Sequence, residues 1–396
     1  MPELALSQMQ IGWLIWASTV GYACFQFPGG ILGQRLGGRR ALFITGLLAA
    51  FGMVAFSLTP GLLSGARLFG VLLATQLVIG MAQAPLFPVT SGVLEIWLPS
   101  HRWAFAQGVL TMASQLGAAV TPPIVVLLMQ HLGWQQALLW PVLIQVAFVV
   151  IWGWYARDDP RCHPSISPSE LKALRAVPAA PMDRKIGMSE VLDIASNRSV
   201  LMLTMSYVSM NYVFYLLASW SFLYLIQERH FTVLQAGWLA SLPPLGAAVG
   251  AGLGGGISDA LCLRFGWIWG YRLVPLAALP AAGGLLLAVI LGTEPFLAVA
   301  ALVVCFAAVE LTEGAFWAAT MRIAQAETAA ATGILNTGGV LGGIIGIPIV
   351  AYLSGHHEWN LAFELGSIFA ALAALGWLGV NVERDQTKRT PHHSGR

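Results

Sequence analysis

Apolar stretches long enough to cross a lipid bilayer dominate this sequence. A spanning helix needs roughly 17–25 predominantly apolar residues. Hydrophobic residues make up 57% of the chain and charged residues 10%, whereas a soluble domain carries about 25% charged residues. This balance excludes an ordinary soluble fold. We predict an all-α polytopic membrane protein with eleven spans, at residues 10–33, 41–60, 66–94, 103–130, 134–155, 199–226, 233–257, 271–292, 296–321, 328–355 and 360–381.

An internal repeat organises these stretches. Gly29-Gly30 and the residues up to Arg40 have a weaker copy at Gly254-Gly255, offset by 225 residues. Glycines four residues apart let membrane helices approach closely. Transporters are commonly built from such repeated halves. The sequence therefore predicts two pseudo-symmetric helix bundles, and the same offset relates further pairs: Gln10 and Gln235, Trp13 and Trp238, Gly21 and Gly246, Gly108 and Gly333, Gly117 and Gly342, Pro123 and Pro348, and Trp134 and Trp359.

The only long polar stretch, residues 156–198, divides the chain. It predicts an N-terminal bundle at 1–155, a linker at 156–198, a C-terminal bundle at 199–381 and a tail at 382–396. Of the 20 lysines and arginines, only Arg67 and Arg229 fall outside the linker, the tail and the loops on the same side. Because cytoplasmic loops concentrate positive charge, we expect the linker and C-terminus to be cytoplasmic, in a bacterial inner membrane.

The number of spans is odd, which is unusual for a duplicated bundle. Shifting the span at 199–226 back by 225 residues places a helix that ends just where this sequence starts. We therefore expect the natural chain to carry one more helix, giving twelve. The alternative is a genuine eleven-helix protein.

The glycine-rich turn resembles the signature of the major facilitator superfamily, G-x-L-x-D-R-x-G-R-R. The matching positions are Gly30, Leu32, Gln34, Arg35, Gly37, Arg39 and Arg40, with Gly255 and Asp259 in the second copy. The resemblance implies a secondary transporter that works by alternating access and uses this turn as a gate. Gln34 departs from the family pattern, because the aspartate that helps to lock the halves together is replaced by an amide.

A narrower likeness connects the chain to the anion:cation symporter branch, which includes hexuronate, galactonate and organic-anion carriers. It rests on Trp154-Tyr155 to Pro164 and on Gly133-Trp134. In that branch a helix reads R-x-x-x-G-x-x-E, but here both charged positions are amides, Gln76 and Gln83. They share one helical stripe.

Several polar residues within the apolar stretches are candidates for lining a substrate cavity. Tyr207, Asn211 and Tyr215 recur every four residues. The competing interpretation is that such groups only hold helices together, or anchor a helix end at the interface. The substrate-binding candidates are Gln76, Gln83, Gln115, Asn211, Tyr215 and Asn336.

Glu310 and Glu313 lie three residues apart in the stretch 296–321. Ionisable groups inside a membrane are costly and are often functional, so this pair is the candidate for proton coupling. A purely structural hydrogen-bond network is the alternative.

We expect a secondary active transporter that moves a small polar or anionic organic solute, with protons as a candidate coupling ion. It should be a monomer in membrane lipid, with no nucleic-acid partner and no cofactor. The four cysteines lack metal-binding spacing, and no cluster of catalytic groups predicts an enzyme. The rival hypothesis is a non-transporting ligand-binding paralogue or receptor, or an inactive truncated transporter.

Overall fold

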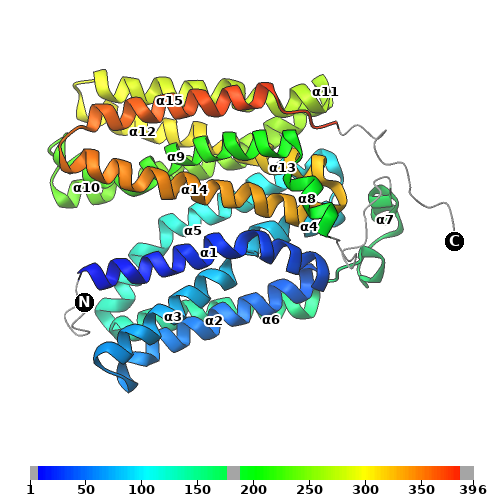
Figure 1. Ribbon diagram of the computed structural model, residues 1–396, viewed down its shortest axis with the longest axis horizontal. Coiled ribbons are helices and arrows are strands. Elements are labelled where there is room, and N and C mark those ends of the chain that lie inside the picture. Colours follow the sequence, from blue (N-terminus) through cyan, green and yellow to red (C-terminus); the bar gives the residue numbers. More distant parts are fainter. Residues whose placement is uncertain (1–7, 176–187, 384–396) are drawn as a thin grey trace.

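The computed structural model describes residues 8–175 and 188–383, and every regular element in those residues is a helix (Figure 1). The predicted tail at 382–396 lies almost entirely outside the described residues. The elements are α1 (Gln8–Leu36), α2 (Gly38–Leu62), α3 (Gly65–Gln83), α4 (Leu86–Trp97), η2 (Ser100–Arg102), α5 (Trp103–Leu132), α6 (Trp134–Tyr155), η3 (Pro160–Cys162), α7 (Pro168–Arg175), α8 (Met188–Ala195), α9 (Arg198–Gln227), α10 (Val233–Leu239), α11 (Leu242–Leu291), α12 (Pro295–Glu310), α13 (Glu313–Ala324), η4 (Gln325–Glu327), α14 (Thr328–Gly355) and α15 (Trp359–Leu378).

Eight segments of the described residues are long and apolar enough to cross a membrane. One of them, Val233–Leu291, has 59 residues, far too many for a single crossing of a hydrocarbon core roughly 30 Å thick. It breaks at Gly266, whose φ of 79° lies in the left-handed region that favours glycine. Helices α1 and α5 are not among the eight. The exact count of eleven spans stays a prediction.

Three predicted spans are each interrupted by a turn, and in residues 233–257 the turn lies at Ala240-Ser241 between α10 and α11. Residues 66–94 form α3 and α4 with a break at Ala84-Pro85, and residues 296–321 form α12 and α13 with a break at Leu311-Thr312. The last two still form single apolar segments long enough to cross a membrane, Gly65–Trp97 and Pro295–Ala324, as predicted. Glu310 and Glu313 therefore flank a break, Glu310 at the end of α12 and Glu313 at the start of α13.

The helices form two bundles, as the repeat predicted (Figure 1). Helices α1, α2, α3 and α6 pack together, and α9 to α15 form the other bundle, whereas α5 and α1 contact α11 and α14 across the interface. The second bundle encloses a large aromatic core that includes Trp317, Trp359 and Trp377. We call the end of the molecule that carries α7 the linker end (right in Figure 1).

Candidate functional site between the bundles

The repeat is visible in the contacts between the bundles. A Cβ atom added to Gly30 of α1 would lie 2.2 Å from the backbone oxygen of Ala329 in α14. At the equivalent position, a Cβ atom on Gly255 of α11 would lie 2.1 Å from the backbone oxygen of Ala104 in α5. Both residue pairs are related by the 225-residue offset. Each crossing therefore brings two backbones so close that only glycine fits.

A second pair of contacts follows the same register. Gly108 of α5 faces the backbone of Ala251 in α11, and Gly333 of α14 faces the backbone of Gln26 in α1. These four residues are again related by 225. The two helix crossings, α1 with α14 and α5 with α11, are thus copies of one packing arrangement.

The α5–α11 crossing carries a charge. The Asp259 carboxylate accepts hydrogen bonds from the backbone N–H groups of Phe105 (2.8 Å) and Ala104 (3.3 Å). These groups belong to the first turn of α5, where the helix dipole and unpaired N–H groups favour an anion. Asp259 is only 6% exposed. This carboxylate therefore caps a helix of the opposite bundle.

The α1–α14 crossing has Gln34 at the position equivalent to Asp259. Gln34 is just as buried, at 5% exposed, but a neutral amide cannot supply the same attraction to a helix N-terminus. The replacement identified in the sequence thus makes two geometrically equivalent crossings electrostatically different.

In the glycine-rich turn, Arg39 forms its hydrogen bonds within the first bundle and not across the interface. Gly37 has a φ of 81°, and a Cβ there would collide with the Asp158 carboxylate. Asp158 accepts a 2.7 Å hydrogen bond from the backbone N–H of Arg39, and Arg39 Nε donates to the Gly153 oxygen at 2.8 Å. Arg39 therefore fastens the start of α2 to the end of α6 within one bundle. Leu32 is half-buried, and Arg35 and Arg40 are exposed.

The two acidic residues of the α12–α13 break are both buried. Glu313 accepts hydrogen bonds from the Tyr207 hydroxyl (2.9 Å) and from Trp317 Nε1 (2.6 Å). Glu310 is 1% exposed, and its Oε2 has no hydrogen-bond partner among the described residues. Gln115 of α5 is a neighbour of Glu310 from the opposite bundle. The structure thus joins two residues that the sequence analysis had singled out separately.

A neutral polar contact joins the bundles at α1 and α14. Asn336 Nδ2 donates to Gln26 Oε1 at 2.9 Å and lies 3.4 Å from the Tyr22 hydroxyl. The sequence analysis found Asn336 but missed both partners. Tyr22, Gln26 and Gly30 recur every four residues, so the helical period would have placed them on one face.

The other candidates lie elsewhere. Asn211 donates to the Tyr207 oxygen within α9 (3.0 Å), and both Asn211 and Tyr215 pack against glycines of α14. Gln76 is half-buried and Gln83 is exposed. Neither amide forms a hydrogen bond with another described residue. In the same part of the chain, no group of three or more His, Cys, Asp or Glu residues could hold a metal ion.

Two repeated bundles, in contact through glycine-lined crossings with carboxylates and amides buried between them, define a membrane transporter. Residues 1–331 match the model of the Major Facilitator Superfamily, and the chain belongs to this superfamily. It is a transporter, not an enzyme.

Comparison with curated proteins shows which transporters the chain resembles. It is 24% identical over 403 residues to a probable sulfoacetate transporter of Cupriavidus necator, covering 96% of this chain and 86% of the relative. It is 24% identical to the hexuronate transporter of Bacillus subtilis, over 86% of this chain and 79% of the relative. It is 25% identical to a probable galactarate/D-glucarate transporter of Escherichia coli, over 95% and 86% of the two chains.

Solved structures agree on the fold. A variant of the Escherichia coli fucose:proton symporter superposes with a TM-score of 0.75 at 15% identity, covering 96% of this chain and 93% of the symporter. The proton:xylose symporter bound to a bromodeoxyglucose gives a TM-score of 0.75 at 12% identity, over 96% and 88% of the two chains.

Proposed function

We propose that this transporter carries a small organic acid and couples its movement to protons through Glu310 and Glu313. The observation that supports this most directly is the position of Glu310. Its carboxyl group is buried at a helix break and neighbours Gln115 of the opposite bundle. The named substrates of the relatives, sulfoacetate, hexuronate, galactarate and glucarate, are all organic acids.

The linker end is proposed to be cytoplasmic, because eighteen of the 20 lysines and arginines fall in the loops, linker and tail assigned to that side. The contacts of Gly30 and Gly255 then close the cytoplasmic side. Opening this side requires both crossings to separate, as alternating access demands. The unit is proposed to be a monomer surrounded by lipid.

Glu310 would respond to the protein's conformation because of where it lies. An ionised carboxylate away from water is unfavourable unless it is paired or hydrogen-bonded. When the bundles separate, Gln115 moves away with α5 and water can reach Glu310, which favours release of a proton. Glu313, held by Tyr207 and Trp317, would keep α13 aligned and share the proton.

The test is uptake into proteoliposomes containing the full chain, using labelled hexuronate and galactarate. Glu310→Gln should abolish uptake driven by an imposed pH gradient while preserving exchange of labelled for unlabelled solute. Glu294→Gln is the matched control, because Glu294 is exposed and caps α12 without a side-chain hydrogen bond. Unchanged gradient-driven uptake in Glu310→Gln would overturn the coupling assignment.

Solute binding without any flux in the unmodified protein would instead favour a ligand-binding paralogue or receptor. The amides at positions 34, 76 and 83 are the feature that would fit that outcome. Binding by equilibrium dialysis, measured on the same preparation, separates the two functions.

A further inference from the structure

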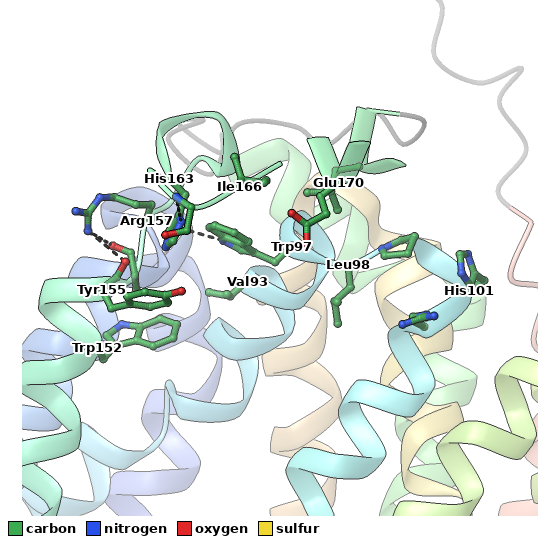
Figure 2. Close-up of a pocket in the computed structure, with 15 residues that line it drawn as sticks. Val93, Trp97, Leu98, His101, Trp152, Tyr155, Arg157, His163, Ile166 and Glu170 are labelled. Carbon is green, nitrogen blue, oxygen red and sulfur yellow. Dashed lines mark hydrogen bonds between the residues drawn. The ribbon is translucent and has the colours of Figure 1, made fainter. Parts of the chain in front are cut away.

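A cavity of about 740 Å³ lies at the linker end, outside the interface between the bundles. It is bounded by the end of α4, the loop that carries η2, the end of α6 and the segment running from residue 156 into α7 (Figure 2). We call residues 156–175 the strap. Cavities of this size commonly accept small molecules or a part of a larger ligand.

The strap is fixed to the first bundle by specific contacts, so the cavity is formed in advance. Trp97 Nε1 donates to the Arg157 oxygen (3.1 Å), and the His163 ring packs edge-on against Trp97 and Tyr155. The Arg157 guanidinium donates to backbone oxygens at the end of α6, including that of Trp154 (2.7 Å). Figure 2 shows Trp97, Tyr155 and His163 close together among the residues that line the cavity.

Hydrogen-bond donors outnumber acceptors among the groups still available in the cavity. The two indole N–H groups are already used, by Trp97 as described and by Trp152 toward the Arg39 oxygen. The side chains of Arg102 and His101 form no hydrogen bond with another described residue. His163 Nδ1 accepts from the Ser165 N–H (3.2 Å), so the proton of the neutral ring is on Nε2.

One acidic side chain, Glu170, also lines the cavity, and its hydrogen bonds leave it a charged carboxylate. Glu170 accepts hydrogen bonds from the backbone N–H (2.9 Å) and hydroxyl (2.7 Å) of Ser167, which together cap α7. An exposed arginine and two imidazoles with spare donors therefore outnumber the single carboxylate of the site. These groups select an anion, and Arg in particular matches phosphate geometry.

The cavity lies at the level expected for lipid headgroups. At the end of α6, Trp154 is 74% exposed and Tyr155 is 56% exposed, and such aromatic residues mark the membrane–water interface. Leu98, Ile166 and Leu174 add apolar walls. Basic pockets beside membrane helices on this side commonly hold anionic lipid headgroups.

We propose that this cavity binds the phosphate headgroup of an anionic phospholipid. Arg102, with the ring donors of His101 and His163, would contact the phosphate, and the aromatic walls would cover the glycerol. Arg102 ends η2 and directly precedes α5, whose first N–H groups are capped by Asp259. A bound lipid would therefore hold the loop that positions one bundle crossing. This effect on transport rests on the proposed gate, but binding itself does not.

Native mass spectrometry tests the proposal. The full chain is mixed with defined lipids in detergent and then released from the detergent in the spectrometer. Phosphatidylglycerol and phosphatidylcholine with identical acyl chains are compared, and glycerol 3-phosphate serves as a soluble phosphate. One phosphatidylglycerol should bind about ten-fold tighter than phosphatidylcholine, and Arg102→Gln should remove about that preference, as expected for one charged hydrogen bond. Arg264→Gln is the control, because Arg264 is also an exposed arginine and lies outside the cavity.

Three results would overturn the proposal. The first is equal affinity for the two lipids in the unmodified protein. The second is an equal loss in Arg102→Gln and Arg264→Gln, which would indicate general surface charge. The third concerns glycerol 3-phosphate. If it binds with an affinity that depends on Arg102 but displaces no lipid, the cavity is a site for a soluble anion. A double variant, His101→Gln with Arg102→Gln, should bind phosphatidylglycerol no better than phosphatidylcholine.

Discussion

The two crossings between the bundles have the same shape but different chemistry. Gly30 approaches Ala329 and Gly255 approaches Ala104 in nearly the same geometry. Beside Gly255, however, Asp259 caps the start of α5, whereas the first copy has Gln34. Close packing therefore repeats with the 225-residue offset, whereas the carboxylate at this position is present in one crossing only. The other crossing instead has the buried Glu327 directly before α14. We expect the α5–α11 crossing to dominate the closed state of the linker end.

The largest effect should come from filling the glycine contacts. Gly255→Leu would force a side chain against a backbone oxygen, and overpacking of this kind costs about 1–3 kcal/mol or more. It should open the linker end, and Gly30→Leu should do so to a similar degree. Spin labels attached at Trp154→Cys and Arg264→Cys, with the native cysteines replaced, would report the distance between the two bundles by double electron–electron resonance. Gly117→Leu is a control, since a Cβ there meets nothing within 4 Å.

Removing the charge at one crossing should have a smaller effect. Asp259→Asn keeps the size of the side chain but weakens its interaction with the first turn of α5, by about 1–2 kcal/mol for a partly buried helix terminus. The same labels should show a shift toward the open linker end. If Asp259→Asn leaves the distance distribution unchanged, the asymmetry between the crossings has no energetic consequence.

Adding a charge at the other crossing should have the opposite sign. Gln34→Asp places a carboxylate at the position equivalent to Asp259, near the start of α14, and the helix dipole should favour the closed linker end by about 0.3–1 kcal/mol. The buried Glu327 at the N-cap of α14 opposes part of this gain by repulsion between like charges. Combined with Asp259→Asn, it should restore part of the closed population. A further opening in the double variant would mean that the two crossings are not interchangeable.

The smallest effect on transport is expected from substitutions of acidic residues in the strap. The Arg161 side chain lowers the pKa of Asp159, and hydrogen bonds from Ser167 lower the pKa of Glu170. A lowered carboxyl pKa stabilises the folded strap above the ordinary values of about 4, and this contribution is lost only as the pH falls through the lowered pKa values. Asp159→Asn and Glu170→Gln should therefore leave the pH profile of uptake between pH 5.5 and 8 unchanged. A shifted profile would place proton sensing on the strap.

Much of the fold could be predicted from the sequence, because membrane helices require long apolar runs and glycine spacing requires close packing. The repeat correctly paired Gly30 with Gly255 and Gly108 with Gly333. The break between Glu310 and Glu313 was missed, since Leu311 and Thr312 are neither glycine nor proline. Their interruption depends on tertiary packing that local sequence does not encode.

The candidate site was less predictable. Glu310 and Gln115 were each identified, but their meeting across the interface requires the relative position of two bundles. Asp158 was seen only as part of a family likeness, and its role in capping α2 depends on the chain returning from α6. Gln76 and Gln83 occupy the positions that the family resemblance assigns to substrate and proton binding. Even so, their side chains form no hydrogen bonds to described residues.

The cap on α5 also bears on the order of events in a transport cycle. If the linker end opens as proposed, the N–H groups of Ala104 and Phe105 would lose Asp259 and face the widened passage. A departing organic acid, the proposed solute, would accept those same two hydrogen bonds, whereas in an empty protein water would have to take its place. The solute itself would thereby ease the step that releases it, and an unloaded carrier would return more slowly than a loaded one.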